Sequence, residues 1–259
     1  MCLTFAALAL LCAQSSTTRP AFDSFEVATI KPTPSEWNAG RFFRMQTANQ
    51  FAARNYTLRV LISAAYNLNP KAISGGPAWV DSDRYDIVAR TPGEVRPNMD
   101  EQLAMLRKLL ADRFNLTFHR EKKEMPIYVL TVAKNGPKLT ESQPVQNPEG
   151  PPPLVFVLAP DVVKVPARSA TTTEFTYILQ RSAFDRPVLD KTGLTARYDF
   201  DLEFAPDESL FGGLLKAPAD ATRPGIFAAL QEQLGLKLES TKGPVDAIVI
   251  DRIDRPSEN

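Results

Sequence analysis

Apolar residues recur every three or four positions in four stretches of the chain, which is the spacing of amphipathic helices. These helices are expected to begin near Thr57, Asn98, Thr171 and Thr222. Asn98 and Thr171 each stand three residues before a glutamate, and this spacing is typical of a capping box. Gly235 follows the last helical pattern and predicts a left-handed stop there.

Extended segments joined by a turn follow the expected helices. The strand pairs are expected at 115–121 with 127–133, at 187–190 with 197–204, and at 236–240 with 245–253. A short helix or a lone hairpin is marginal in water and is stabilised by its neighbours. The repetition therefore predicts an α+β fold of duplicated helix-plus-β-hairpin units, with antiparallel or mixed sheets and helices packed on one face.

Two kinds of strand are distinguished by their side chains. Residues 197–204 alternate strictly between apolar and charged side chains, so one face of this strand is expected to be buried and the other solvated. Residues 127–132 and 247–250 are instead apolar on both faces. This pattern is typical of central strands that are covered on both sides.

A proline-rich segment suggests how the chain is divided. Residues 143–153 are rich in proline and poor in apolar side chains, which favours a linker. The segment separates two α+β halves of similar content, 22–142 and 154–259.

Composition limits the classes of partner. The chain has 259 residues, of which 44% are hydrophobic, and this is enough for a sizeable core. The 30 basic residues balance the 30 acidic ones, so no net field would draw nucleic acid to the protein.

The first residues have the character of a leader. Residues 3–13 form an uncharged apolar run of signal-peptide length, too short to span a bilayer, although a positive n-region is missing. We expect a signal peptide at 1–13 and a secreted or periplasmic mature chain without a transmembrane segment. An outer-membrane lipoprotein anchored at Cys12 is less favoured, because bulky Leu11 precedes it. Cys2 and Cys12 both lie in this leader, so the mature chain would hold neither a disulfide nor a thiolate metal site.

A glycine-containing loop is the main candidate for a binding groove. Gly75 and Gly76 permit backbone angles that are closed to other residues, and Trp79 offers a large amphipathic surface beside Asp81 and Asp83. A ligand or peptide groove could be built from these residues. The alternative is a structural turn in which Trp79 packs over the first helix, and this alternative is favoured about two to one.

A second candidate surface lies in the long loop 206–225. Phe211 and Leu214 belong to an apolar patch between glycines in this loop. Such a patch either folds back over the core or is offered to a partner. Phe211 therefore joins the candidate binding residues.

Charged residues give little support for catalysis or metal binding. Asp199, Asp201 and Glu203 share one strand face at intervals of roughly 6 to 7 Å, which is wide for chelating one ion. They are expected to form a solvated acidic face that pairs with Lys or Arg on a neighbouring strand. His119, the single histidine, lies opposite the apolar residues of its strand and has no nucleophile motif to work with. We expect no metal, no cofactor and no established catalytic residue.

Several strings resemble a soil-associated secreted family of acidobacterial-type genomes, carried as a domain of unknown function. They lie at residues 25–32, 74–79, 110–114, 190–200 and 229–259. The resemblance implies export and supplies no catalytic residue. Some relatives are joined to membrane-embedded metallopeptidase sensor domains, which implies sensing or binding, but this chain lacks their His-Glu-x-x-His motif. More weakly, the expected units resemble the small periplasmic domains of secretins and TonB-dependent receptors.

Two functions remain open. The leading hypothesis is a non-enzymatic extracytoplasmic binding or sensing module that engages an envelope or extracellular protein, a peptide or a small ligand. The alternative is a carboxylate-based hydrolase acting on an envelope or polysaccharide substrate. It would use two of the five acidic residues named above, facing each other across a cleft and one with a raised pKa.

Overall fold

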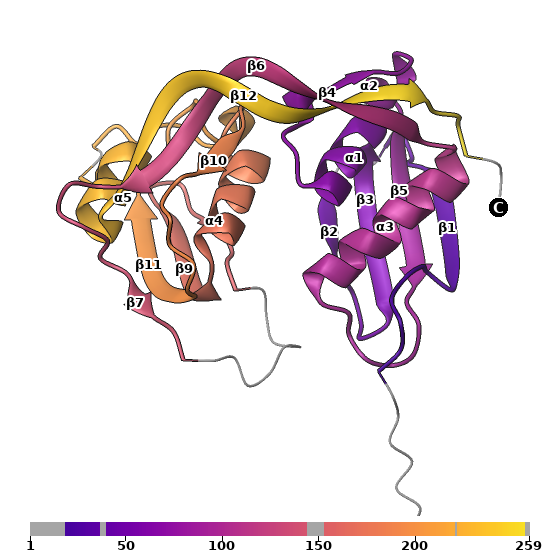
Figure 1. The fold of residues 1–259 in the computed structure, drawn as a ribbon, viewed down its shortest axis with the longest axis horizontal. Helices are drawn as coiled ribbons and strands as arrows, with labels where there is room; N and C mark the ends of the chain where they lie inside the picture. Colours follow the sequence, from indigo (N-terminus) through magenta and orange to yellow (C-terminus); the bar gives the residue numbers. More distant parts are fainter. Residues whose placement is uncertain (1–18, 37–39, 144–152, 221, 257–259) are drawn as a thin grey trace, which may run out of the picture.

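The protein has two lobes joined by a long twisted ribbon of two strands (Figure 1). The computed structural model describes residues 19–36, 40–143, 153–220 and 222–256. The expected signal peptide, the anchor at Cys12 and nearly all of the segment 143–153 lie outside these residues, so all three stay predictions. Among the described residues, no helix combines the length and apolar character needed to cross a membrane.

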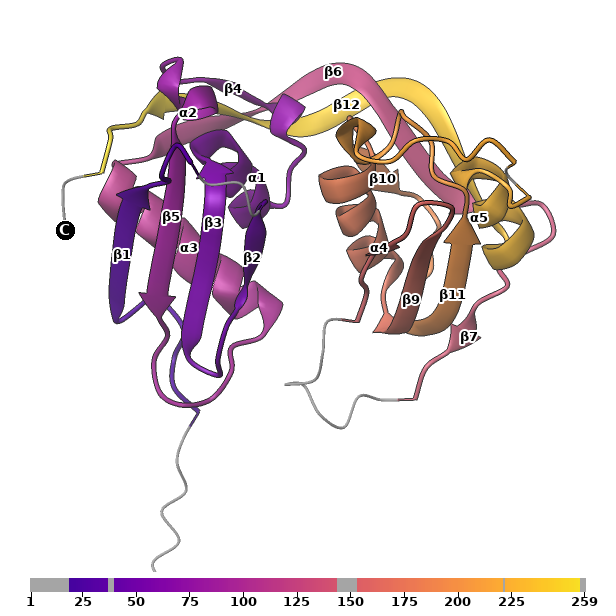
Figure 2. The ribbon, with the colours of Figure 1, turned by 180° about the vertical axis from the view of Figure 1, so that it is seen from behind.

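The first lobe is a four-stranded antiparallel sheet with two helices on one face (Figures 1 and 2). The sheet order is β1-β5-β3-β2. Its strands are β1 Val27–Pro32, β2 Phe42–Met45, β3 Gln50–Thr57 and β5 Arg84–Arg90. The helices are α1 Leu58–Tyr66 and α3 Met99–Phe114. Between α1 and β5 lie the 3-10 turn η1 Pro70–Ala72, the short strand β4 Ile73–Gly75 and the short helix α2 Trp79–Ser82.

The second lobe repeats this plan with shorter elements. Its antiparallel sheet has the order β7-β11-β9-β8. The strands are β7 Thr140–Glu141, β8 Val157–Leu158, β9 Val163–Ala170 and β11 Tyr198–Phe204, and the short strand β10 is Val188–Asp190. The helices are α4 Thr172–Ile178, continued by the π-helical turn η2 Leu179–Ala183, and α5 Ile226–Leu234. The turn η3 Phe211–Gly213 lies in the loop before α5.

All three expected hairpins are wrong: β10 and β11 lie in different sheets, and the strands expected in the other two hairpins form one long ribbon. It consists of β6 Thr117–Val132 and β12 Leu236–Arg252, which pair antiparallel along their whole length. The sequence pattern predicts turns at 122–126 and 241–244, but these polar segments pair with each other and continue both strands. They carry exposed charges because the ribbon crosses from one lobe to the other there. The prediction that 127–132 and 247–250 are central strands is confirmed by the order β10-β6-β12-β4.

The α+β class is therefore confirmed. The predicted repeat unit, a helix followed by a hairpin, is wrong, because the topology repeats a longer unit. Taken in chain order, β1 to β3, α1, β4, β5, α3 and β6 correspond one to one with β7 to β9, α4, β10, β11, α5 and β12. The four-stranded antiparallel sheets of the two lobes then have the same strand order. The repeated unit is three strands, a helix, two strands, a second helix and a long strand.

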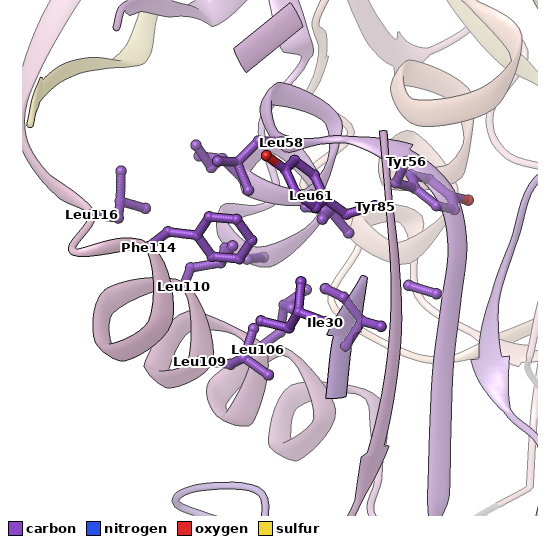
Figure 3. Close-up of a cluster of buried hydrophobic side chains, with 14 of the residues drawn as sticks. Ile30, Tyr56, Leu58, Leu61, Tyr85, Leu106, Leu109, Leu110, Phe114 and Leu116 are labelled. Carbon is purple, nitrogen blue, oxygen red and sulfur yellow. The ribbon is translucent and has the colours of Figure 1, made fainter. Parts of the chain in front are cut away.

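The two halves exchange their long strands. β12 of the second half pairs in parallel with β4 of the first, and β6 of the first half pairs in parallel with β10 of the second. Ile248 and Ile250 accordingly belong to the first lobe's core, and Leu130 belongs to the second. Figure 3 shows part of the first core, where Leu110 and Phe114 of α3 lie close to the side chains of α1. Each hydrophobic core therefore contains residues from both predicted halves, 22–142 and 154–259.

Three of the four helix starts agree with the sequence. Thr57, Asn98 and Thr171 are the N-caps of α1, α3 and α4, and the last two form complete capping boxes. α5 begins at Ile226, later than expected near Thr222. The residue before a proline is disfavoured in a helix, and Arg223 precedes Pro224. Gly225 is extended, and the carbonyl of Pro224 accepts a hydrogen bond from the amide of Ala205.

Candidate functional site

A cavity of about 230 Å³ lies where the two lobes meet beside the ribbon. Segments from both halves form its walls. They are the end of α1 and the following turn (Asn67, Leu68, Asn69, Ala72), α4 and η2 (Thr173, Thr176, Tyr177, Gln180), Pro187 with strand β10, and Val245 and Asp246 of β12. Interfaces between domains are a common place for ligand pockets.

Two asparagines shape the wall from the first lobe. Asn67 ends α1 in the left-handed conformation, with φ 54°, which asparagine tolerates better than most residues. Asn69 caps η1, because its side chain accepts a hydrogen bond from the amide of Lys71. Pro70 at the first position of this turn fixes the backbone for it. The Asn69 side chain is 3% exposed and donates across the lobes to the carbonyl of Gln180, at 3.1 Å.

The opposite wall comes from the widened end of α4. The π-helical turn η2 begins at Leu179 and places Gln180 against the first lobe. The Gln180 amide donates to the backbone and side-chain oxygens of Asn67, at 3.4 and 3.3 Å. Tyr177 donates its hydroxyl proton to the carbonyl of Ala64, at 3.4 Å. Single π-helical turns are frequent at functional sites, and here the turn brings hydrogen-bonding side chains to the interface.

The charge on the cavity wall is acidic. Among the described residues that line it, Asp190 and Asp246 are carboxylates, and none is Lys, Arg or His. Asp246 pairs with Lys122 at 2.8 Å across the ribbon. Asp190 accepts hydrogen bonds from the backbone amide and hydroxyl of Thr192, at 3.0 and 2.7 Å. The cavity therefore offers amides, hydroxyls and carboxylates to a ligand and disfavours an anion.

An ion pair beside the cavity also connects the lobes. Lys71 of the first lobe lies 2.9 Å from the carboxylate of Asp185 in the second. Hydrogen bonds from Arg186 and Lys71 lower the pKa of Asp185 to about 2. The interface thus has a charged contact at its rim as well as neutral hydrogen bonds inside.

Five of the sequence-predicted binding residues gather in the first lobe around α2, where other side chains contact them. Gly75 and Gly76 have φ of 75° and 76°, as their sequence suggests. Trp79 is half-buried and lies under the guanidinium of Arg255, 4.9 Å from its ring centroid.

The two aspartates of this group are also engaged. Asp83 accepts hydrogen bonds from Nε and Nη2 of Arg255, at 3.0 and 2.9 Å. Asp81 accepts two hydrogen bonds from Arg59, and this pairing lowers its pKa. Arg59 and Arg255 therefore engage the aspartates and the tryptophan of this loop, whereas Gly75 and Gly76 stay exposed.

The sixth predicted residue, Phe211, lies in the other lobe. It packs edge to face against Phe156, with 5.1 Å between the ring centroids. Leu210 in the same loop is completely buried, whereas Leu214 is 69% exposed. The loop folds back over the core through its first residues and leaves one leucine in solvent.

Two of the carboxylates proposed for hydrolysis, Asp199 and Glu203, have a lowered pKa. The expected pairing with basic residues across strands is confirmed for Glu203, which pairs with Lys164 at 2.6 Å, and for Asp201, which pairs with Arg168 at 3.0 Å. The Lys164 hydrogen bond lowers the pKa of Glu203, and the Ser142 hydroxyl does the same for Asp199. A general acid requires a raised pKa.

The single histidine, His119, lies on strand β6 of the ribbon. His119 is exposed, and its Nδ1 lies 2.8 Å from the carboxylate of Asp251. Within the described ranges, no group of three or more His, Cys, Asp or Glu side chains could hold a metal ion.

Comparison with known proteins identifies a family without assigning a function. A family model described as "Protein of unknown function (DUF3738)" matches residues 59–253. The matched region runs from α1 to the end of the ribbon strand β12, so it includes every wall of the inter-lobe cavity. No curated protein and no solved structure matches the chain significantly.

Proposed function

The chain belongs to the DUF3738 family of proteins of unknown function, and we propose from its structure that it is a non-enzymatic binding module for a small neutral polar molecule. The ligand occupies the cavity between the lobes. The single observation that carries this proposal is that cavity, with its walls of amides, hydroxyls and carboxylates drawn from both halves of the chain.

The volume and lining define the ligand class. A cavity of about 230 Å³ is smaller than the roughly 300 to 1,000 Å³ of pockets for drug-sized molecules. Asn67 and Gln180 offer amide donors and acceptors, Thr173 offers a hydroxyl, and Asp190 offers carboxylate oxygens. A monosaccharide or another small polyol satisfies such mixed groups without bringing a charge. The two carboxylates oppose an anionic ligand.

Binding at this place would act on the arrangement of the lobes. Asn67, Tyr177 and Gln180 line the cavity and also form the hydrogen bonds between the lobes. A ligand that contacts both walls stabilises the orientation in which both walls face it, because only differential affinity shifts a conformational equilibrium. This coupling suits a sensing module.

The sequence supports a location and a class of partner for this module. The apolar run at 3–13 supports export, and an envelope or extracellular protein would receive the signal of an occupied cavity. A reporter fusion to residues 1–20 tests the export signal. Retention of that fusion in the cytoplasm would remove this part of the proposal.

Titration calorimetry tests the ligand class. The panel contains neutral monosaccharides and polyols, together with the matched sugar acids and amino sugars. We expect a neutral member to bind and its acid analogue to bind much more weakly. Binding of the amino sugars alone, or of no member of the panel, would contradict the proposed ligand class.

Asp190→Asn is the informative variant, because it retains an oxygen for Thr192 and removes the charge. Its affinity is expected to fall by about tenfold, or about 1.4 kcal/mol. Asp201→Asn on the outer face of β11 is the matched control and should bind as the wild type does. Equal affinity in both variants would place the ligand elsewhere.

A further inference from the structure

A second cavity, of about 400 Å³, lies at the end of the first lobe's sheet, away from the interface between the lobes. It is bounded by the ends of β1 and β5 and by the segment after β12. We call it the arginine pocket and define it by Thr33, Asp83, Arg84, Tyr85 and Arg255. Its residues are distinct from those of the inter-lobe cavity.

The arginine pocket carries a net positive charge. Arg84 and Arg255 supply two guanidinium groups, and Asp83 is the one carboxylate among the described lining residues. Arg255 is paired with Asp83. Arg84 donates instead to neutral acceptors, the backbone and side-chain oxygens of Asn55, at 3.1 and 3.4 Å. Guanidinium groups match the geometry of a carboxylate, so an anionic head group is favoured here.

The remaining walls are apolar. Ile30 and Tyr85 are each 4% exposed and form the buried side of the pocket, and two prolines line its rim. Because Tyr85 is buried, the pKa of its hydroxyl is raised. A volume of about 400 Å³ falls within the roughly 300 to 1,000 Å³ of small-molecule sites. The pocket thus combines one surplus positive charge with a hydrophobic wall.

We propose that the arginine pocket binds a monocarboxylate that carries an aromatic or aliphatic body. The carboxylate lies against Arg84 and Arg255, and the body packs on Ile30 and Tyr85. Both a free organic acid and the C-terminus of a peptide present this chemistry. The site is independent of the inter-lobe cavity, which disfavours anions.

Trp79 provides the signal for a direct test. The Arg255 guanidinium lies over its ring, so a ligand that engages Arg255 changes the surroundings of the indole. The chain has two tryptophans, and Trp37→Phe leaves Trp79 as the single emitter. The mature chain with this substitution is titrated with phenylacetate, and with phenylacetamide as the uncharged analogue. We expect the fluorescence of Trp79 to change saturably with the acid and to stay unchanged with the amide.

Variants then locate the binding. Arg84→Gln should weaken phenylacetate binding by about tenfold or more, whereas Arg90→Gln, on the same strand but outside the pocket, should leave it unchanged. Asp83→Asn releases Arg255 from its carboxylate and should tighten binding several-fold. If Arg84→Gln does not fold, the acid-to-amide comparison and Asp83→Asn decide the question.

Three results would overturn the proposal: equal binding of acid and amide, wild-type affinity in Arg84→Gln, or no tightening in Asp83→Asn. A peptide that ends in phenylalanine, with a free or an amidated C-terminus, distinguishes the two sources of the carboxylate. Binding of the free peptide indicates a peptide ligand, and binding of phenylacetate alone indicates a free acid. Neutral sugars should not compete with either.

Discussion

The guanidinium of Arg255 lies 4.9 Å above the ring centroid of Trp79 and fastens the segment after β12 to the first lobe. The same guanidinium pairs with Asp83. Ile253, two residues earlier, is buried in the first lobe's core. The end of the ribbon is thus held by Ile253 in the core and by Arg255, whose contacts with Trp79 and Asp83 involve α2 and the residue after it.

Arg255→Ala is therefore expected to lower the free energy of unfolding by about 1 kcal/mol, because it removes a cation–π contact and an exposed ion pair. Arg252→Ala removes an exposed ion pair alone and should change stability by less than about 0.5 kcal/mol. Urea unfolding measures both variants. Equal stability of the two would show that the stacking on Trp79 contributes nothing.

The contact between Arg255 and Trp79 also explains why the sequence of the α2 region, residues 75–83, is compatible with both a binding loop and a structural turn. Gly75, Trp79 and Asp83 have the residue types of a binding loop, and their side-by-side placement could be expected from their proximity in the chain. Arg255, which stacks on Trp79 and pairs with Asp83, comes from the far end of the sequence, 172 residues after Asp83. No local pattern indicates this contact.

The helices were predictable because their signals are local. Asn98 and Thr171 form capping boxes with glutamates three residues away, and both boxes are present. The ribbon was not predictable in the same way. Residues 122–126 and 241–244 are polar and contain proline or glycine, which locally indicates a turn. Only their pairing with each other makes them strand.

The inter-lobe cavity escaped sequence reasoning for the same reason. Asn69 and Gln180 are 111 residues apart and meet through the strand exchange. In the sequence, Asp190 only ends the expected strand 187–190, and nothing in that pattern relates it to Asn69. The correspondence between the two halves is the signal that could have found the cavity, since α1 and α4 occupy equivalent places in the repeated unit.

The strand exchange predicts that neither half folds alone. Residues 19–143 lack Ile248 and Ile250, which are buried in the first core, and each such side chain contributes roughly 1.5 to 3 kcal/mol. Residues 153–256 likewise lack Leu130 of the second core. Each fragment should show no cooperative unfolding transition, and the mixture should elute as one folded complex. A cooperative transition in either fragment alone would contradict this expectation.

Acid should weaken the interface between the lobes through Asp185. The pKa of this carboxyl is lowered from 3.8 to about 2 by its hydrogen bonds to Arg186 and Lys71. A lowered pKa in the folded state means that the stabilisation is complete above pH 3.8 and is lost as the pH falls toward 2. Because the pair is exposed, its contribution is at most about 1 kcal/mol.

Asp185→Asn tests this dependence. The variant should be slightly less stable than the wild type at neutral pH and equal to it near pH 2, as measured by urea unfolding at a series of pH values. Asp201→Asn removes an ion pair that lies within the second lobe and serves as the control for general charge effects. A constant difference between Asp185→Asn and the wild type at all pH values would exclude titration of Asp185 as the cause.

Gly75 should be the least replaceable residue of the α2 region. Its φ of 75° is unfavourable for other residues, and an added Cβ would lie 2.7 Å from the carbonyl oxygen of Ile250 in β12. Gly75→Ala must therefore strain the backbone and also push apart the parallel pairing of β4 with β12. Gly193→Ala is the matched control, because Gly193 has a φ of 71° but nothing within 4 Å of the added atom. Backbone strain of about 1 to 2 kcal/mol is common to both, so the excess loss in Gly75→Ala, measured by urea unfolding, reports the close approach. If both variants lost the same free energy of unfolding, β12 would have to move away from the added methyl group without destabilising the protein.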